Sequence, residues 1–135
     1  MEDHPIFLTL SEVLEIHKNQ IEIYGGKEGV RDLSLLMSAI AMPETSFQGE
    51  YLHLDLFEMA AAYAYYICMN HPFVDGNKRV GLVAALVFLD FNGVEIDDSE
   101  GILYDAMMKV ASSEKKKDFL SDIFRHLSPG VKGNA

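Results

Sequence analysis

The sequence predicts an all-α protein, built as a compact helical bundle around a central helix–loop–helix. Two segments, residues 54–69 and 80–91, are apolar on nearly every side, which is typical of buried helices. Between them lies a short polar stretch, residues 71–79, which must therefore join two core elements. A chain of 135 residues that is 49% hydrophobic has enough material for one core, and we expect a single domain over residues 1–128.

Before the central pair, the sequence first predicts a helix and indicates where it begins and ends. Residues 6–10 suit either a short strand or an entry segment. Ser11 is the expected N-cap of a helix that runs to Tyr24, and the Gly25–Gly26 pair should end it.

A second helix is expected to start at Asp32, which has the right side chain for an N-cap, and to end before Pro43. Its apolar residues have helical spacing: Leu33, Leu36, Met37 and Ile40. The periodicity is lost over residues 43–53, which predicts either a loop or a short β-hairpin.

After the central pair, Asn92–Gly93 predicts a helix stop, and residues 94–96 suit a short extended piece. Either Asp98 or Ser99 should cap the next helix. A last helix is expected over residues 114–127, followed by a flexible tail over residues 129–135.

Composition narrows the range of functions. The formal net charge of -10 argues against a nucleic-acid surface and against an anionic membrane as partner. The single cysteine, Cys68, excludes an intramolecular disulfide and a multi-cysteine zinc site, and we expect it in the core. The acidic start, residues 1–5, lacks the positive charge of a signal peptide, and no apolar run is long enough to span a bilayer. We therefore expect a cytoplasmic protein.

The polar loop carries the positive charge of the middle of the chain. From residue 32 to residue 108 the only lysine or arginine residues are Lys78 and Arg79. They lie at the start of a helix, where unpaired N–H groups and the macrodipole favour an anion, and Gly76 permits close approach. The predicted phosphate-binding residues are Gly76, Asn77, Lys78 and Arg79.

Two further loop residues suggest chemistry. Asp75 would repel a phosphate unless a divalent cation bridged them, and Mg²⁺ is held in this way by one carboxylate and substrate phosphates. Pro72 disfavours a helical conformation at His71, so the imidazole should project from the loop, where a general base belongs.

Structural interpretations stand beside these. Asp75 or Asn77 could cap the helix, and Lys78 and Arg79 could be a solvated pair, although positive charge at a helix N-terminus opposes the dipole. The remaining side chains with chemical potential are interpreted as structural or solvated: His17, His53, His126, Tyr63, Tyr65, Tyr66 and Lys115–Lys117.

Residues 71–79 read His-Pro-Phe-Val-Asp-Gly-Asn-Lys-Arg, and this stretch resembles the core motif of the Fic/Doc family, His-Pro-Phe-x-(Asp or Glu)-Gly-Asn-(Gly or Lys)-Arg. The resemblance implies a helical Fic-type fold that moves a phosphate-containing group from a nucleotide such as ATP to a protein hydroxyl. It implies His71 as the catalytic base, Asp75 as the Mg²⁺ ligand and residues 76–79 as the phosphate cradle. By position, residues 47–53 would form the family's flap over the active site.

Lys78 bears on which group is transferred. Adenylylating relatives usually have glycine there and a second arginine where this chain has Leu82. Lysine is typical of the Doc branch, toxins of toxin–antitoxin pairs that transfer the γ-phosphate to a hydroxyl of a translation elongation factor. The resemblance implies that this lysine, by filling space that the outer phosphates would otherwise occupy, favours a reversed nucleotide with its γ-phosphate near His71. Adenylylation, and a silent module that binds a nucleotide or partner without turnover, remain the alternatives.

The resemblance also bears on regulation. Many family members carry an inhibitory helix with the pattern (Ser or Thr)-x-x-x-Glu-(Gly or Asn). Ser11 with Glu15 and Ser46 with Glu50 come nearest, but neither has the final residue. We therefore expect restraint in trans, by a small antitoxin whose segment folds into a groove on this protein.

Overall fold

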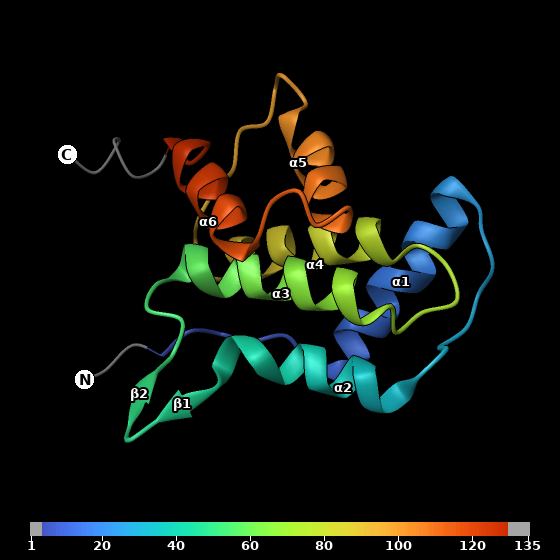
Figure 1. Cartoon of the computed structure of the whole chain (residues 1–135), viewed down its shortest axis with the longest axis horizontal. Helices are drawn as coiled ribbons and strands as arrows, with labels where there is room; N and C mark the ends of the chain where they lie inside the picture. Colours follow the sequence, from blue (N-terminus) through green and yellow to red (C-terminus); the bar gives the residue numbers. More distant parts are fainter. Residues whose placement is uncertain (1–3, 130–135) are drawn as a thin grey trace.

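The computed structural model describes residues 4–129. It confirms the all-α prediction: helices surround a central antiparallel pair, and a small hairpin is the only sheet within the described range (Figure 1). The elements in chain order are α1 (Leu10–Tyr24), α2 (Leu33–Ala41), the short 3₁₀ helix η1 (Met42–Glu44), β1 (Ser46–Phe47), β2 (Glu50–Tyr51), α3 (Leu56–Asn70), α4 (Asn77–Phe91), α5 (Ile102–Ala111) and α6 (Lys117–His126).

The central pair, α3 and α4, packs with its backbones in near contact. A Cβ placed on Gly81 would lie 2.8 Å from the carbonyl oxygen of Ala64, so the absence of a side chain at Gly81 allows this approach. Tyr63 on α3 is fully buried, and its hydroxyl accepts a hydrogen bond of 2.8 Å from the N–H of Leu8. Burial raises the pKa of Tyr63. Cys68 lies in this core as predicted, and burial raises the pKa of its thiol.

The N-cap of α1 is a different residue from the predicted one. Thr9 is the N-cap, not Ser11: its hydroxyl accepts the N–H of Glu12, while the Glu12 carboxylate accepts the N–H of Thr9. This reciprocal capping box satisfies two N–H groups that a single cap at Ser11 would leave open. For α2 the prediction is confirmed, since the Asp32 carboxylate accepts the N–H of Leu35 at 3.0 Å.

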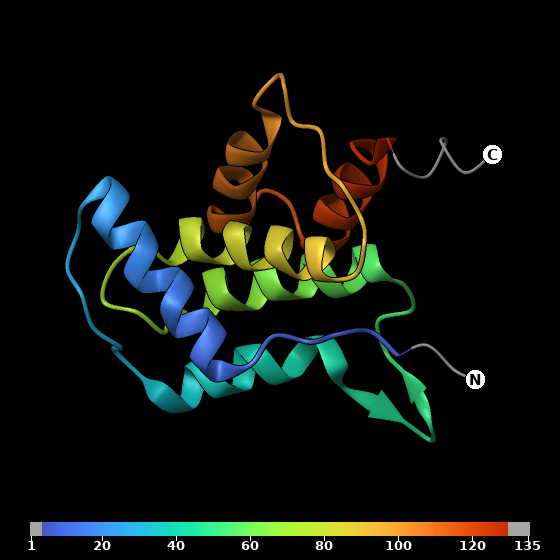
Figure 2. The same ribbon diagram turned by 180° about the vertical axis from the view of Figure 1, so that it is seen from behind.

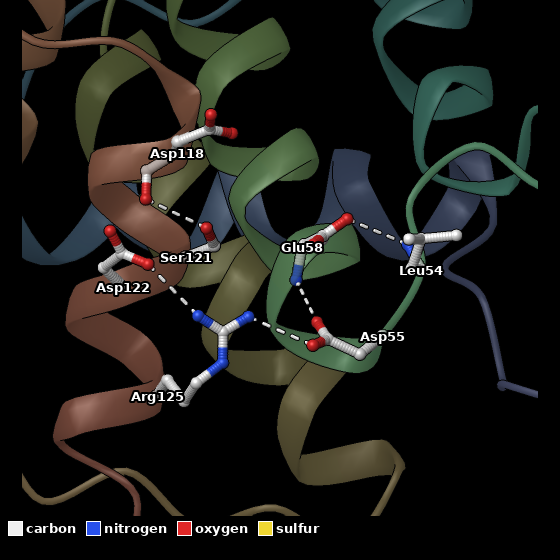
Figure 3. A network of polar contacts seen from close by, with 7 residues as sticks. All are labelled: Leu54, Asp55, Glu58, Asp118, Ser121, Asp122 and Arg125. Atoms are coloured by element: carbon white, nitrogen blue, oxygen red, sulfur yellow. Dashed lines mark hydrogen bonds and ion pairs between the residues drawn. The ribbon is translucent and has the colours of Figure 1, made fainter.

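A polar network fixes the start of α3 against α6 (Figure 3). The Asp55 carboxylate caps α3 by accepting the N–H of Glu58 at 2.8 Å, and it also accepts the Arg125 guanidinium at 3.0 Å. Arg125 donates a second bond to Asp122, one turn earlier on α6. Both ends of the Arg125–Asp55 ion pair are partly exposed, so we assign it orientation rather than a large stabilisation.

The C-terminal helices begin later than predicted. The N-cap of α5 is Gly101, so neither Asp98 nor Ser99 occupies the predicted N-cap position. The Asp98 carboxylate still accepts the N–H groups of Ile102 and Leu103, at 2.7 and 3.1 Å. α6 begins at Lys117 and not at residue 114, because the N–H of Glu114 is bonded to the end of α5, at the carbonyl of Lys109.

The hairpin forms within residues 43–53 as expected, whereas no strand forms at residues 6–10. The position of the hairpin decides whether it can lie over the motif loop. The hairpin precedes α3 and the motif loop follows α3, so the two lie at opposite ends of that 15-residue helix, about 22 Å long (Figures 1 and 2). Among residues 4–129 no helix could cross a membrane. The predicted flexible tail lies outside the described residues, except for Pro129.

Candidate active site

The loop between α3 and α4 presents His71 at the end of α3. The helix ends at Asn70, as the following proline predicts, and His71 is exposed as its C-cap. Its backbone is left-handed, with φ 48° and ψ 52°, an uncommon conformation for a residue with a side chain. A strained residue of this kind persists only when its surroundings hold it, and such residues cluster at functional sites.

Arg31 holds this helix end from a distant part of the chain. Its Nε donates to the carbonyl of His71 at 2.7 Å, and its second guanidinium nitrogen donates to the carbonyl of Asn70 at 3.1 Å. A guanidinium at a helix C-terminus satisfies carbonyls that have no partner in the helix and favours the negative end of the dipole. No local pattern indicates this role, because Arg31 lies 40 residues before His71 in the chain.

Asn77 closes the loop from the other side. Its Oδ1 accepts the N–H of Phe73 at 2.9 Å, and its Nδ2 donates to the carbonyl of Phe73 at 3.0 Å. Nδ2 also lies 3.5 Å from Nδ1 of His71. Because the buried side chain is used within the loop, a contact between Asn77 and a phosphate would come from its backbone N–H in the first turn of α4.

The segment that lies along the motif loop is residues 27–32. Its backbone pairs with the loop in short β-type contacts: the N–H of Val74 donates to Gly29, and the carbonyl of Pro72 accepts from Arg31 and Asp32 at 2.7 and 3.0 Å. The predicted flap, residues 47–53, is therefore wrong in position, since the hairpin lies at the far end of α3.

Asp75 is exposed and held by backbone donors. Its two carboxylate oxygens accept the N–H groups of Lys27 and Gly76, at 3.2 and 3.1 Å. Gly26 lies so close that an added Cβ would meet the carboxylate at 2.9 Å. The surroundings thus orient this carboxylate toward the start of α4 while leaving it open to solvent.

His17 supports the loop from α1. It is buried, its ring stacks on Phe73 with 4.0 Å between centroids, and its Nε2 lies 3.1 Å from the carbonyl oxygen of Asp75. The structural interpretation of His17 agrees with these contacts, although the residue does touch the loop.

The start of α4 carries the features of an anion site. Gly76 is the N-cap with φ 85°, and no side chain of residues 4–129 caps the helix, so its first N–H groups are available to an anion. Half-buried Lys78 and Arg79 follow in the first turn, and the Arg79 guanidinium stacks 4.4 Å from the ring centre of Tyr24. A cavity of about 140 Å³ opens here, lined by Asp75, Gly76, Asn77, Lys78, Arg79 and Tyr104.

The structure thus brings Asp75, Gly76, Asn77, Lys78 and Arg79 together around one cavity, to which α5 adds Tyr104. His71 lies on the same loop but does not line this cavity. Within residues 4–129 no group of three or more metal-binding side chains occurs, so a metal cage made by protein alone is absent from this range. The exposed carboxylate of Asp75 lines a cavity that also has the positively charged side chains of Lys78 and Arg79, and this arrangement fits a Mg²⁺ ion shared with phosphates.

A second cluster corrects one surface interpretation. Lys117 is not simply solvated: its Nζ lies 2.9 Å from Nε2 of buried His53 and 3.5 Å from the hydroxyl of Tyr66. Burial, with a smaller contribution from the Lys117 charge, lowers the pKa of His53. Lys115 and Lys116 are exposed as expected.

The chain is similar in sequence to proteins of a known family. A model of the Fic/DOC family matches residues 7–89. The chain is 36% identical over 100 residues to the "Toxin Doc" of Mycolicibacterium smegmatis, a match that covers 73% of this chain and 77% of that protein. It is 34% identical over 120 residues to the "Protein kinase doc" of Escherichia phage P1, covering 89% and 94% respectively.

Proposed function

Because the chain belongs to the Fic/DOC family, we propose that it is a Doc-like toxin that transfers the γ-phosphate of a nucleoside triphosphate to a hydroxyl of a protein, such as a translation elongation factor. One observation carries the proposal: exposed His71 lies on the same short loop as the uncapped N-terminus of α4, with Lys78 and Arg79 in its first turn. A base and an anion cradle are thus adjacent. Such a reaction belongs in the cytoplasm, where nucleotide and target occur together.

In this reaction His71 accepts the proton of the target hydroxyl as its oxygen attacks the γ-phosphorus. The bond from that phosphorus to the bridging oxygen breaks, and the nucleoside diphosphate leaves. Lys78, Arg79 and the N–H groups of α4 hold the phosphates and stabilise the charge of the transition state. Mg²⁺ bound by Asp75 would neutralise phosphate charge there. Arg31 keeps His71 in place through its backbone.

Lys78 favours γ-phosphate transfer over adenylylation. The cavity at the start of α4 is small, about 140 Å³, and Lys78 is part of its wall. The residue at position 82, where adenylylating relatives usually have an arginine, is a half-buried leucine that supplies no charge to the phosphates. A relative named a protein kinase, 34% identical over 120 residues, supports the same choice.

The test uses ATP labelled at either the α- or the γ-phosphate, with Mg²⁺ and bacterial lysates. Wild type should label a protein from γ-labelled ATP only. His71→Ala should lose the labelling, by about 10²–10⁴-fold in rate, while its nucleotide affinity stays within a few-fold. Lys78→Gly should also lose γ-labelling. Phe47→Ala, an exposed side chain on the remote hairpin, is the matched control and should label normally.

Two other functions are outcomes of this test. Labelling of wild type from the α-position would promote adenylylation. Nucleotide binding without labelling in several lysates would favour a silent nucleotide- or partner-binding module. No observation favours adenylylation or a silent binding module over the transfer of the γ-phosphate.

Toxin relatives imply an antitoxin partner, and we propose a groove for it. A hollow of about 360 Å³ between α1 and α4 has an apolar floor and an acidic edge, lined by Glu12, Glu15, Ile16, Asn19, Val83, Val87 and Phe91. The two carboxylates favour a segment that is apolar on one face and basic at its margins. We expect a small antitoxin from an adjacent gene to fold into it.

Growth assays test this restraint. Expression of wild type alone should slow growth, His71→Ala should relieve it, and co-expression of the adjacent-gene protein should also relieve it. Phe91→Lys should stay toxic in the presence of that protein, and its toxicity demonstrates that it folds. Met108→Lys, an exposed residue on α5 outside the groove, should still be restrained. Harmless expression of soluble wild type would contradict a toxin.

A further inference from the structure

Tyr104 is the one residue outside the motif that lines the cavity at the start of α4, within the part of the chain that the structure describes. It reaches this cavity from α5, and its side chain is 49% exposed. The other lining residues present charges, an amide and backbone. Tyr104 therefore gives a polar cavity its single aromatic surface, and no step of the proposed phosphate transfer uses it.

We propose that the ring of Tyr104 is the platform on which the nucleobase stacks, and that it makes this site selective for purine nucleotides. The inference rests on the proposed function, because it places a nucleotide at the start of α4. A cavity of about 140 Å³ holds phosphates but not a whole nucleoside triphosphate, so the ribose and base must extend past its rim.

The neighbouring side chains leave Tyr104 as the surface for that base. Lys78 has no flat face to offer. The Arg79 guanidinium is flat, but it already stacks on Tyr24 at 4.4 Å, and this contact also covers one face of the Tyr24 ring. A base that leaves the phosphate cradle along α5 meets the half-exposed ring of Tyr104. Stacking accepts any base, and the larger surface of a purine gains more from it than that of a pyrimidine.

Binding measurements by calorimetry in Mg²⁺ test the platform without any need for a target protein. The ligands are ATP, CTP and inorganic tripolyphosphate, which has the phosphates but no base. Tyr104→Leu and Tyr104→Ala should bind ATP about tenfold more weakly than wild type, the lower part of the range for loss of a base–aromatic stack. Their affinity for tripolyphosphate should stay within about twofold. Tyr104→Phe keeps the ring and should bind ATP like wild type.

Met108→Ala is the matched control, since this exposed residue lies one turn further along α5 and does not line the cavity. It should bind all three ligands like wild type, and wild type should bind ATP more tightly than CTP. Equal ATP affinity in wild type and Tyr104→Leu would overturn the inference alone. An equal loss for ATP and tripolyphosphate would overturn it too, because the residue would then act on the phosphates. If wild type bound neither ATP nor tripolyphosphate, the proposed function would be overturned together with the inference.

Discussion

Asn77→Ala is the sharpest test of how the loop is built. The change removes the acceptor for the N–H of Phe73 and the donor to its carbonyl, bonds of 2.9 and 3.0 Å made by a buried side chain. Each backbone group left without a partner costs about 1–3 kcal/mol. The better helix propensity of alanine returns about 0.6 kcal/mol. For two such groups, the free energy of unfolding should therefore fall by about 1.5–5.5 kcal/mol.

Urea denaturation followed by circular dichroism measures this loss, with Asn77→Asp as the partner variant. Aspartate can still accept the N–H of Phe73, but its second oxygen would face the carbonyl oxygen of Phe73 and could not donate to it, so its loss should be at least half as large. Transfer activity should fall in both variants, because the loop that carries His71 loosens. A loss below about 1 kcal/mol for Asn77→Ala would refute the reasoning, since it would mean that water or a rearranged backbone satisfies Phe73.

Three further predictions follow. Gly81→Ala should lower the free energy of unfolding by about 1–2 kcal/mol, because crowding against the carbonyl of Ala64 outweighs the gain of about 1 kcal/mol in helix propensity; unchanged urea stability would show that α3 and α4 can separate freely. Burial and the charge of Lys117 lower the pKa of His53 from 6.5 in the folded protein. The unfolded chain therefore binds this proton more readily, and the free energy of unfolding falls as the pH drops through 6.5. The free energy of unfolding of His53→Leu should fall less steeply between about pH 7 and 5, and identical slopes in the two proteins would contradict this. Asp75→Asn should abolish transfer and weaken Mg²⁺-dependent nucleotide binding with little change in melting temperature, whereas undiminished transfer would remove Asp75 from the mechanism.

The sequence could predict the motif loop because its parts are neighbours in the chain. The proline after His71 and the glycine at position 76 indicate where one helix ends and the next begins, and Lys78 and Arg79 mark the anion site. The capping box also has a local signal, a threonine at position 9 followed three residues later by a glutamate, and this pattern favours Thr9 over Ser11 as the N-cap.

Other features of the site depend on the tertiary fold and have no local signal. Arg31 and Tyr104 reach the site from 40 residues before His71 and from the next helix after α4, and neither stands in a recognisable pattern. The hairpin was predicted in the right place in the chain but assigned to the wrong end of α3. Position in the sequence does not state on which side of a helix a segment lies, and a 15-residue helix separates its two ends by about 22 Å.

The contacts around the loop explain how an exposed histidine can keep a left-handed backbone. Residues 27–32 hold Pro72 and Val74 through backbone bonds, Arg31 holds the carbonyl of His71, and Asn77 holds Phe73 from inside. Of these contacts only those of Asn77 come from a core helix, α4, and the others come from residues 27–32, which precede α2. The position of the base therefore depends largely on a surface segment that is far from it in sequence. Changes in residues 27–32 should therefore reduce transfer while leaving the core, and most of the stability, intact.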